Sequence, residues 1–314
     1  MNLQQLRIVR ETIRRDFNLT EVANALFTSQ PGVSRHIKDL EDELGVEIFE
    51  RRGKRLLGLT GPGRELASVV ERILLDTENL HRIADQFASR ETGHFVVATT
   101  HTQARYALPP VIKWFKEDYP RVHLILHQGS PREIAEMLTA GEADIGIATE
   151  GLDKHDDLAA FPCYEWRHAV IVPQGHPLQS VDQLTLEALG HYPIITYHAG
   201  FTGRSHIDQA FAKAGIVPDV VLSAIDADVI KTYVSLGLGV GLIASMAFNA
   251  EHDRGLALLS ADALFPVNTT RLAVRKGAWL RSYAHAFIEK VSPELSENVV
   301  KQAIRQYKRT ESMD

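Results

Sequence analysis

The chain has 314 residues, 45% of them hydrophobic and 24% charged, which is ordinary for a soluble globular protein with two or three domains. One cysteine excludes an internal disulfide, and charges throughout residues 1–15 do not fit a signal peptide, so we expect a cytoplasmic protein without a membrane span. The net charge of −6 argues against nucleic-acid binding by the whole surface, but residues 1–64 carry a net charge of +2.

Two short helices joined by a tight connection are predicted within residues 19–51. Thr20 is placed to cap the first helix and Ser29 the second, with Pro31 in the first turn of the second helix. In this second helix the residues at spacing i, i+4 and i+7 are apolar: Val33, Ile37 and Leu40. This spacing predicts one buried stripe along the helix.

The opposite face of the second helix is polar and basic, because Ser34, Arg35 and Lys38 fall there. Such a face is either an ordinary solvated surface or the surface with which a helix-turn-helix enters a DNA major groove. A predicted hairpin follows, with four cations within five positions: Arg51, Arg52, Lys54 and Arg55. That density suits contact with phosphates, although a solvated loop tip has the same composition.

Ordered motifs run through this region: Ser29-Gln30-Pro31-Gly32-Val33-Ser34-Arg35, Leu40-Glu41, Leu44-Gly45, Ile48-Phe49-Glu50-Arg51 and Leu59-Thr60-x-x-Gly63. Their order resembles the LysR-type transcriptional regulators, in which the second helix reads DNA and the hairpin is a wing. The resemblance implies an all-α winged helix-turn-helix domain over residues 1–59. It also implies a set of DNA-binding residues: Ser29, Gln30, Ser34, Arg35, Lys38, Arg51, Arg52, Lys54 and Arg55.

A long linker helix is predicted for residues 60–90, with Thr60 as its N-cap. Its apolar side chains recur every seven residues: Leu66, Ile73, Leu80 and Phe87. Heptads sustained over this length predict either pairing with a second helix or packing onto the helix's own domain. The resemblance implies pairing, because linker helices of the family form dimers, which commonly assemble further into tetramers.

Strands and helices alternate after residue 91. The expected strands are 95–99, 122–127, 143–148, 168–172, 194–197, 219–224, 240–243, 256–259 and 270–274. The expected helices are 106–119, 130–139, 204–214, 228–236 and 282–291. The alternation predicts parallel βαβ units with ligand sites at the carboxyl ends of the strands.

We therefore expect an α/β effector domain of two βαβ lobes over residues 91–295, similar to a periplasmic-binding-protein clamp. Lobe I is predicted to span residues 91–162 and 268–295, and lobe II residues 163–267, with chain crossings near 162–164 and 265–268. The remaining residues, 296–314, are expected to form a helix that frays into a polar tail.

Hydroxyl and amide side chains gather where these strands end and helices begin. Thr100, Thr102 and Gln103 follow one strand, Thr149 follows another, and Thr202 lies in a glycine-rich turn of the second lobe. Helix N-termini with such donors attract small anions, although ordinary helix capping produces the same pattern.

Further motifs lie in both lobes: TTHTQARYALP, HQGSP, IATE, PCYEW, GFTGRS and DADVIKTYVSLGLGVGLIASMA. They are similar to the cysteine-regulon, or CysB-like, branch of the family. The resemblance implies an interlobe site for N-acetylserine, O-acetylserine, sulfate or thiosulfate. The effector-binding residues implied are Thr100, Thr102, Gln103, Thr149, Thr202 and Trp166.

The sequence lacks the motifs expected for catalysis or for a cofactor. The glycine-rich stretch at 237–241 does not fit a dinucleotide fingerprint, because Leu242 stands where the motif requires its third glycine. No histidine pair with helical i, i+4 spacing stands beside a carboxylate, and no serine has a nucleophile-elbow setting. We therefore expect no enzyme activity, no cofactor and no metal.

The most consistent interpretation is a transcription activator of sulfur assimilation and cysteine biosynthesis. Its expected partners are double-stranded promoter DNA, a small anionic effector, further copies of the chain in a homo-tetramer and, as a further candidate, RNA polymerase. A regulator of aliphatic sulfonate use is an alternative within the family. A solute-binding protein would share the two lobes, but the helix-turn-helix counts against it.

Overall fold

The computed structural model describes residues 1–53, 55–88 and 92–305. The chain divides into two compact units, residues 1–87 with 277–279, and the remainder. The predicted DNA contact Lys54, the domain boundary at residues 90 and 91, and the tail at 306–314 lie outside the described residues. None of the helices in the described ranges is both long enough and apolar enough to cross a membrane.

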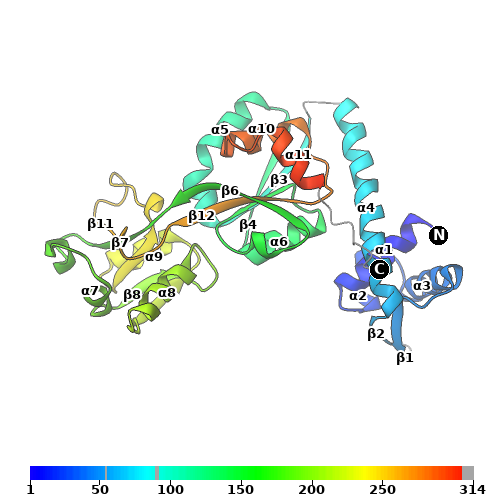
Figure 1. Cartoon of the computed structure of the whole chain (residues 1–314), viewed down its shortest axis with the longest axis horizontal. Coiled ribbons are helices and arrows are strands. Elements are labelled where there is room, and N and C mark those ends of the chain that lie inside the picture. Colours follow the sequence, from blue (N-terminus) through cyan, green and yellow to red (C-terminus); the bar gives the residue numbers. More distant parts are fainter. Residues whose placement is uncertain (54, 89–91, 306–314) are drawn as a thin grey trace, which may run out of the picture. The chain divides into compact units, whose positions relative to one another are not determined.

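The N-terminal unit is a helical domain with a β-hairpin (Figure 1). Its elements are α1 (Leu3–Arg14), α2 (Leu19–Ala25), α3 (Gln30–Leu44), β1 (Phe49–Arg52), β2 (Arg55–Leu59) and α4 (Gly61–Ala88). The buried stripe expected on α3 is present, since Val33, Ile37 and Leu40 are at most 1% exposed. They pack with apolar residues of α1, α2 and the hairpin in one core. Because β1 and β2 pair antiparallel, the domain is not all-α.

Caps mark the helix ends in this unit. The predicted cap Thr20 is wrong: the side chain of Asn18 accepts hydrogen bonds from the backbone N–H groups of Thr20 and Glu21, so α2 begins earlier. Asparagine is at least as good an N-cap as threonine. Ser29 caps α3 as predicted, because its Oγ accepts the Gly32 N–H.

Thr60 lies at the start of α4, where its Oγ1 accepts a hydrogen bond of 2.9 Å from the N–H of Gly63. The helix begins close against the preceding chain. A Cβ on Gly63 would lie 2.0 Å from the carbonyl oxygen of Ile48, so only glycine fits there. This close approach explains the glycine of the motif that ends the hairpin.

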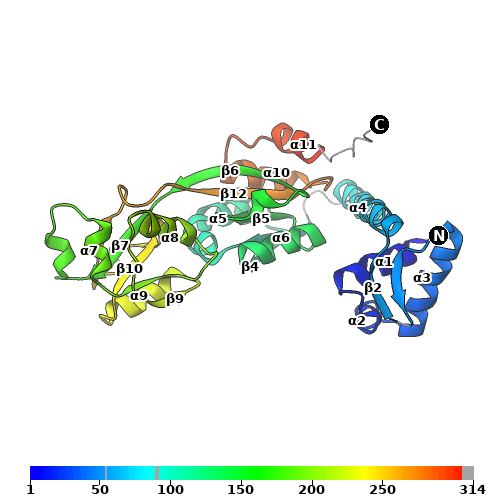
Figure 2. The same ribbon diagram turned by 60° about the horizontal axis from the view of Figure 1, so that its bottom comes forward.

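The second unit contains two five-stranded sheets, one per lobe, in the described part of the chain. The first has the order β4-β3-β5-β12-β6 and the second β11-β7-β10-β8-β9. The first sheet is formed by β3 (Gly93–Thr99), β4 (Val122–Gln128), β5 (Ile145–Ala148), β6 (Leu158–Trp166) and β12 (Asn268–Arg275). The second is formed by β7 (His168–Pro173), β8 (Ile194–Tyr197), β9 (Val220–Ala224), β10 (Val240–Ala244) and β11 (Leu256–Ser260). The long strands β6 and β12 run from the first lobe towards the second (Figure 2).

Helices cover both faces of each sheet. Those of lobe I are α5 (Pro109–Asp118), α6 (Pro131–Ala140), α10 (Ser282–Val291) and α11 (Glu297–Arg305). Those of lobe II are α7 (Leu186–Gly190), α8 (Arg204–Lys213) and α9 (Ala227–Ser235). In lobe I, α5, α10 and α11 share one core and α6 belongs to another. In lobe II, α7 and α8 pack on one side and α9 on the other.

Short helical turns complete the second unit: η1 (Gln103–Ala107), η2 (Leu152–Lys154), η3 (Pro177–Ser180) and η4 (Ser245–Ala247). The helix expected at 106–119 therefore begins later, at Pro109, and a π-helical turn precedes it. A proline at the first helical position is favourable, because its missing N–H would lack a helical partner there.

The first chain crossing lies later than predicted. Strand β6 pairs with β12 as far as Trp166 opposite Asn268, so the chain leaves the first sheet at Arg167 rather than at residues 162–164. The predicted lobe boundary at residue 162 lies inside β6. Pro162 is accommodated because β6 is an edge strand and the register shifts beside it.

Candidate functional site

The second helix of the helix-turn-helix exposes the predicted basic face. Arg35 is highly exposed and makes only a long ion pair with Asp39, 3.7 Å between Nε and Oδ2. Gln30 and Lys38 are also exposed, and Ser34 is half-buried. Ser29 is exposed, but its hydroxyl is engaged in capping α3. This side of α3 therefore offers an amide and two cations to a partner.

The cations of the hairpin have different surroundings. Arg51 donates a hydrogen bond of 2.5 Å to Glu41, which is 8% exposed and also accepts the backbone N–H groups of Ile48 and Phe49. Arg52 and Arg55 are exposed and lie opposite each other in the hairpin register. Arg51 therefore holds the wing against α3, whereas Arg52 and Arg55 are available to a partner.

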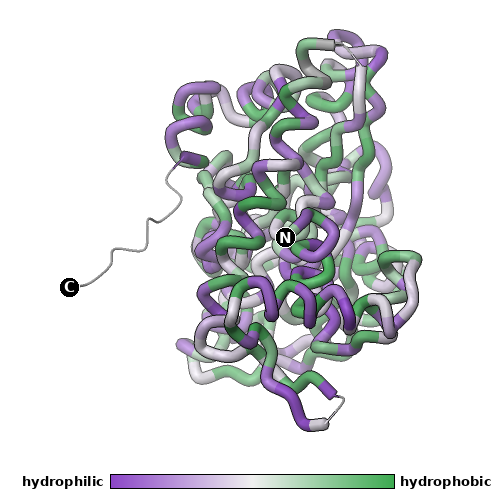
Figure 3. Tube along the Cα trace, turned by 90° about the vertical axis from the view of Figure 1, so that its right-hand side faces the viewer, coloured by the Kyte–Doolittle hydropathy of each residue, from purple (hydrophilic) through white to green (hydrophobic). Residues whose placement is uncertain are grey.

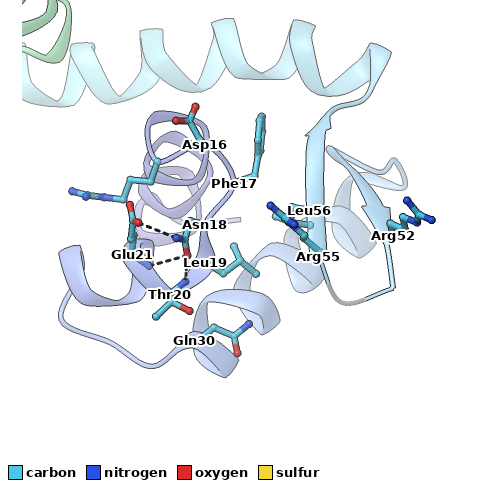
Figure 4. Close-up of a pocket in the computed structure, with 11 residues that line it drawn as sticks. Asp16, Phe17, Asn18, Leu19, Thr20, Glu21, Gln30, Arg52, Arg55 and Leu56 are labelled. Carbon is cyan, nitrogen blue, oxygen red and sulfur yellow. Dashed lines mark hydrogen bonds between the residues drawn. The ribbon is translucent and has the colours of Figure 1, made fainter.

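An open groove of about 670 Å³ runs between the start of α2 and the hairpin. Figure 4 shows Arg52 and Arg55 on the hairpin side and Gln30 at the start of α3. Asn18 lies on the α2 side and is held by hydrogen bonds to Thr20 and Glu21. The part of the hairpin that precedes residue 54 is hydrophilic (Figure 3). The α2 side of the groove also carries the carboxylates of Asp16 and Glu21, so the exposed cations Arg52 and Arg55 on the hairpin side are the groups that suit a phosphate backbone.

The predicted effector residues are buried at the junction of the two lobes. Their exposed fractions are 4% for Thr100, 0% for Thr102 and Gln103, 8% for Thr149, 5% for Trp166 and 3% for Thr202. The hydroxyl oxygens of Thr102 in lobe I and Thr202 in lobe II lie 3.2 Å apart. The strand-end segments of the two lobes therefore meet directly through these threonines.

Thr270 near the start of β12 connects the other predicted effector residues to one another. Its hydroxyl accepts hydrogen bonds from Gln103 Nε2 at 3.2 Å and Trp166 Nε1 at 3.1 Å. The hydroxyl of Thr149 lies 3.4 Å away. Tyr164 donates to the other end of the Gln103 amide. Thr270 and Tyr164 were not among the predicted site residues, although both stand close to a predicted crossing.

A second series of hydrogen-bonded polar side chains lies at the crossing between the lobes, and the sequence analysis did not predict it. His168 Nε2 lies 3.1 Å from the carbonyl oxygen of Thr202, and its Nδ1 lies 3.2 Å from Asn268 Nδ2. Asn268 in turn contacts His206 of α8 at 2.9 Å. Burial lowers the pKa of His168 to about 4, so its ring is neutral at physiological pH.

The backbone at the start of α8 lies very close to the crossing between the lobes. Thr202 has a φ of 45°, a strained value for a β-branched residue, and strain of this kind clusters at functional sites. A Cβ on Gly203 would lie 2.2 Å from Asn268 Oδ1, so only glycine lets the helix start so near the crossing. The N-cap Gly203 has no side chain to accept from the first turn of α8, where the N–H groups of Arg204 and His206 donate to the carbonyl oxygens of Phe201 and Gly203. The positive end of this helix thus lies beside Thr202.

These groups are suited to binding a small ligand, and they do not form an arrangement of nucleophile, acid and base. They are hydroxyls, an amide, an indole N–H and a helix N-terminus, the kinds of neutral donor that can hold a small anion. In this structure the side chains hydrogen-bond one another. Within the residues that the structure describes, no cluster of three or more metal-ligating side chains occurs.

A small-molecule-binding domain of two α/β lobes and a winged helix-turn-helix together define a class of one-component transcription regulators. Residues 3–64 match the family of bacterial regulatory helix-turn-helix proteins, lysR family, and residues 88–296 match the LysR substrate binding domain. The chain belongs to the LysR-type transcriptional regulators and is therefore a regulator rather than an enzyme. Proteins of this family bind DNA and small effectors, and they oligomerise.

Individual relatives extend the match over almost the whole chain. The regulator SsuR of Burkholderia cenocepacia is 60% identical over 98% of this chain and 99% of its own. CysB of the same organism is 52% identical, covering 97% of both chains. The crystal structure of the cofactor-binding domain of the Cbl transcriptional regulator is 48% identical and has a TM-score of 0.67, covering 68% of this chain and 94% of that one. The predicted resemblance to the CysB-like branch is confirmed.

Proposed function

We propose that this regulator controls genes of sulfur assimilation and cysteine biosynthesis in the cytoplasm, in response to a small anion bound between the lobes. The candidate effectors are N-acetylserine, O-acetylserine, sulfate and thiosulfate. The observation that carries the proposal is the buried set of neutral donors at the lobe junction, where Thr102 meets Thr202 beside the start of α8. These effectors are the ones that the resemblance to the CysB-like branch implies, and CysB is 52% identical to this chain.

The proposed mechanism is a population shift. An effector with different affinities for two arrangements of the lobes would favour one of them. Through the linker helices of a tetramer, that arrangement would set the spacing of the DNA-reading helices. The regulator would then activate biosynthetic promoters, with RNA polymerase as a partner, and repress its own gene.

A second candidate is regulation of aliphatic sulfonate utilisation. The identity with SsuR, 60%, exceeds the identity with CysB, 52%, and this order favours the second candidate. The two candidates differ in their promoters and can share the same effector site.

The effector site is tested by removing one hydroxyl at a time. Thr102→Val and Thr202→Val keep the side-chain shape and remove a donor. Each lost hydrogen bond to a charged ligand should cost about 1.5–3 kcal/mol, which is tenfold or more in affinity. Isothermal calorimetry with sulfate and with N-acetylserine measures the change.

Matched controls exist in both lobes. Thr99 and Thr196 are fully buried threonines whose hydroxyls donate to the carbonyl groups of Ile147 and Leu242. Thr99→Val and Thr196→Val should lower stability without a comparable loss of affinity. If all four variants bind both anions like the wild type while remaining folded, the proposed site is wrong.

A further inference from the structure

Tyr106 belongs to lobe I by chain order but packs into lobe II. It lies in the π-helical turn η1, after the lobe I strand β3. Its ring packs against the apolar cluster of lobe II that includes Tyr197, Ile230 and Ala247. Its hydroxyl donates a hydrogen bond of 2.7 Å to Asp228 Oδ1 on α9. A single side chain thus makes both an apolar and a polar contact across the lobe junction.

Charged groups surround this contact. Asp228 Oδ2 lies 3.5 Å from Arg105 Nε, and Asp228 Oδ1 lies 3.1 Å from Lys231 Nζ. Lys231 Nζ also lies 5.4 Å from the centre of the Tyr106 ring, within cation–π range. Burial raises the pKa of Asp228, but hydrogen bonds from Tyr106 and Lys231 outweigh this effect and keep the pKa below its ordinary value. The acceptor of the Tyr106 hydroxyl is therefore charged at neutral pH.

The same turn carries two of the proposed effector contacts. Thr102 is the N-cap of η1 and Gln103 is its first residue, only a few positions before Tyr106. π-Helical turns are rare and frequently mark functional sites. A ligand that engages Thr102 or Gln103 acts on the turn that also holds Tyr106 in lobe II.

We propose that Tyr106 and Asp228 form an interlobe latch that couples effector binding at Thr102 and Gln103 to the relative position of the lobes. The identity of the ligand rests on the proposed function, but the latch itself rests on the contacts of Tyr106. When binding requires one arrangement of the lobes, the apparent affinity falls in proportion to the population of that arrangement. Opening the latch should therefore lower the affinity for chemically different ligands by the same factor.

The test compares Tyr106→Phe with Tyr233→Phe in the full-length protein. Both substitutions remove one tyrosine hydroxyl, but Tyr233 lies on a partly exposed face of the same helix α9. Hydrogen exchange of the ligand-free protein should be several-fold faster in η1 and at the start of α9 for Tyr106→Phe and unchanged for Tyr233→Phe. Calorimetry should show sulfate and N-acetylserine both weakened, by roughly the same three- to tenfold factor.

Three outcomes would decide against the latch or its coupling. Unchanged exchange in Tyr106→Phe would overturn the latch, and unequal losses for the two ligands would overturn the coupling. Asp228→Asn, which removes the acceptor's charge at constant size, must reproduce the faster exchange, and its failure to do so also overturns the latch. If the wild type binds neither anion, the proposed function fails and hydrogen exchange decides the latch alone.

Discussion

Arg51 and Arg52 are neighbours in the sequence, but they have different roles in the structure. The sequence shows four equivalent cations at the hairpin, because composition carries no information about distant partners. The structure separates them: Arg51 pairs with the buried carboxylate of Glu41 on α3, whereas Arg52 lies opposite Arg55 in the hairpin register. Glu41 lies ten residues earlier, and no local periodicity links the two.

We predict that Arg51→Ala destabilises the winged helix-turn-helix, whereas Arg52→Ala does not. Removing Arg51 leaves a buried carboxylate with only its two backbone donors, at a cost of about 1–2 kcal/mol after allowance for the partial exposure of the arginine. Chemical denaturation measures the difference. In salt-dependent DNA binding, Arg52→Ala should weaken all sequences alike. Equal stabilities for the two variants would contradict the structural role of Arg51.

The residues of the candidate effector site could be predicted only in part. Strand ends and helix starts point to Thr102, Gln103 and Thr202, because parallel strands direct their carboxyl ends to one edge. Thr270 was not predicted, because its partner Gln103 is 167 positions away in the chain. His168 was expected only as part of a strand, and its burial follows from the crossing rather than from its neighbours in sequence.

The buried His168 predicts a stability that depends on pH. Its pKa falls from 6.5 to about 4 on folding, so the unfolded chain binds the proton more tightly. Stability should therefore be complete above about pH 6.5 and fall by up to about 3 kcal/mol as the pH drops towards 4.

Urea unfolding of the wild type and of His168→Gln between pH 7 and pH 4.5 measures this effect. The two proteins share every other titratable group, so the difference between them isolates His168. A wild-type stability that falls no more steeply with acid than that of His168→Gln would contradict the prediction.

Whole elements were predicted better than their ends. The periodicity of apolar residues identified α3, and the heptads identified α4, because local spacing determines which helix face is apolar. Strand β6 was not among the predicted strands, since Pro162 and polar neighbours interrupt any alternation there. An edge strand tolerates such residues because it pairs on one side only.

The heptad residues of α4 divide into two groups. Leu66 and Ile73 are partly buried against the core of the winged helix-turn-helix. Leu80 and Phe87 are 68% and 75% exposed. The two later positions are therefore the ones free to pair with a second chain, as we propose for the dimer.

We predict that Leu80→Glu splits the dimer without unfolding the domain. A carboxylate in an apolar helix seam is costly to desolvate, whereas Leu80 contributes little to the core of its own chain. His81→Glu introduces the same charge on an exposed position beside the seam and serves as the control. Light scattering that shows the same oligomer for Leu80→Glu and the wild type would mean that α4 pairs elsewhere or not at all.

At the scale of the molecule, the chain combines a DNA-binding unit with a two-lobed effector unit. The family matches cover residues 3–64 and 88–296, close to the two compact units. The net charge of the whole chain does not reveal the two units, because the negative charge of the later residues exceeds the positive surplus of residues 1–64. Local charge at the winged helix-turn-helix is what a DNA groove experiences.

We propose above that this regulator recognises promoters of sulfur genes in an effector-dependent way. Footprinting with the full-length protein on the upstream regions of sulfate-transport, cysteine-synthesis and sulfonate-utilisation operons tests it most directly, with and without N-acetylserine and sulfate. We predict protection of a discrete site in at least one of these regions, with a boundary that shifts when the effector is added. Protection that is absent from all of these regions, or that is identical with and without each anion, would contradict effector-dependent control of sulfur genes.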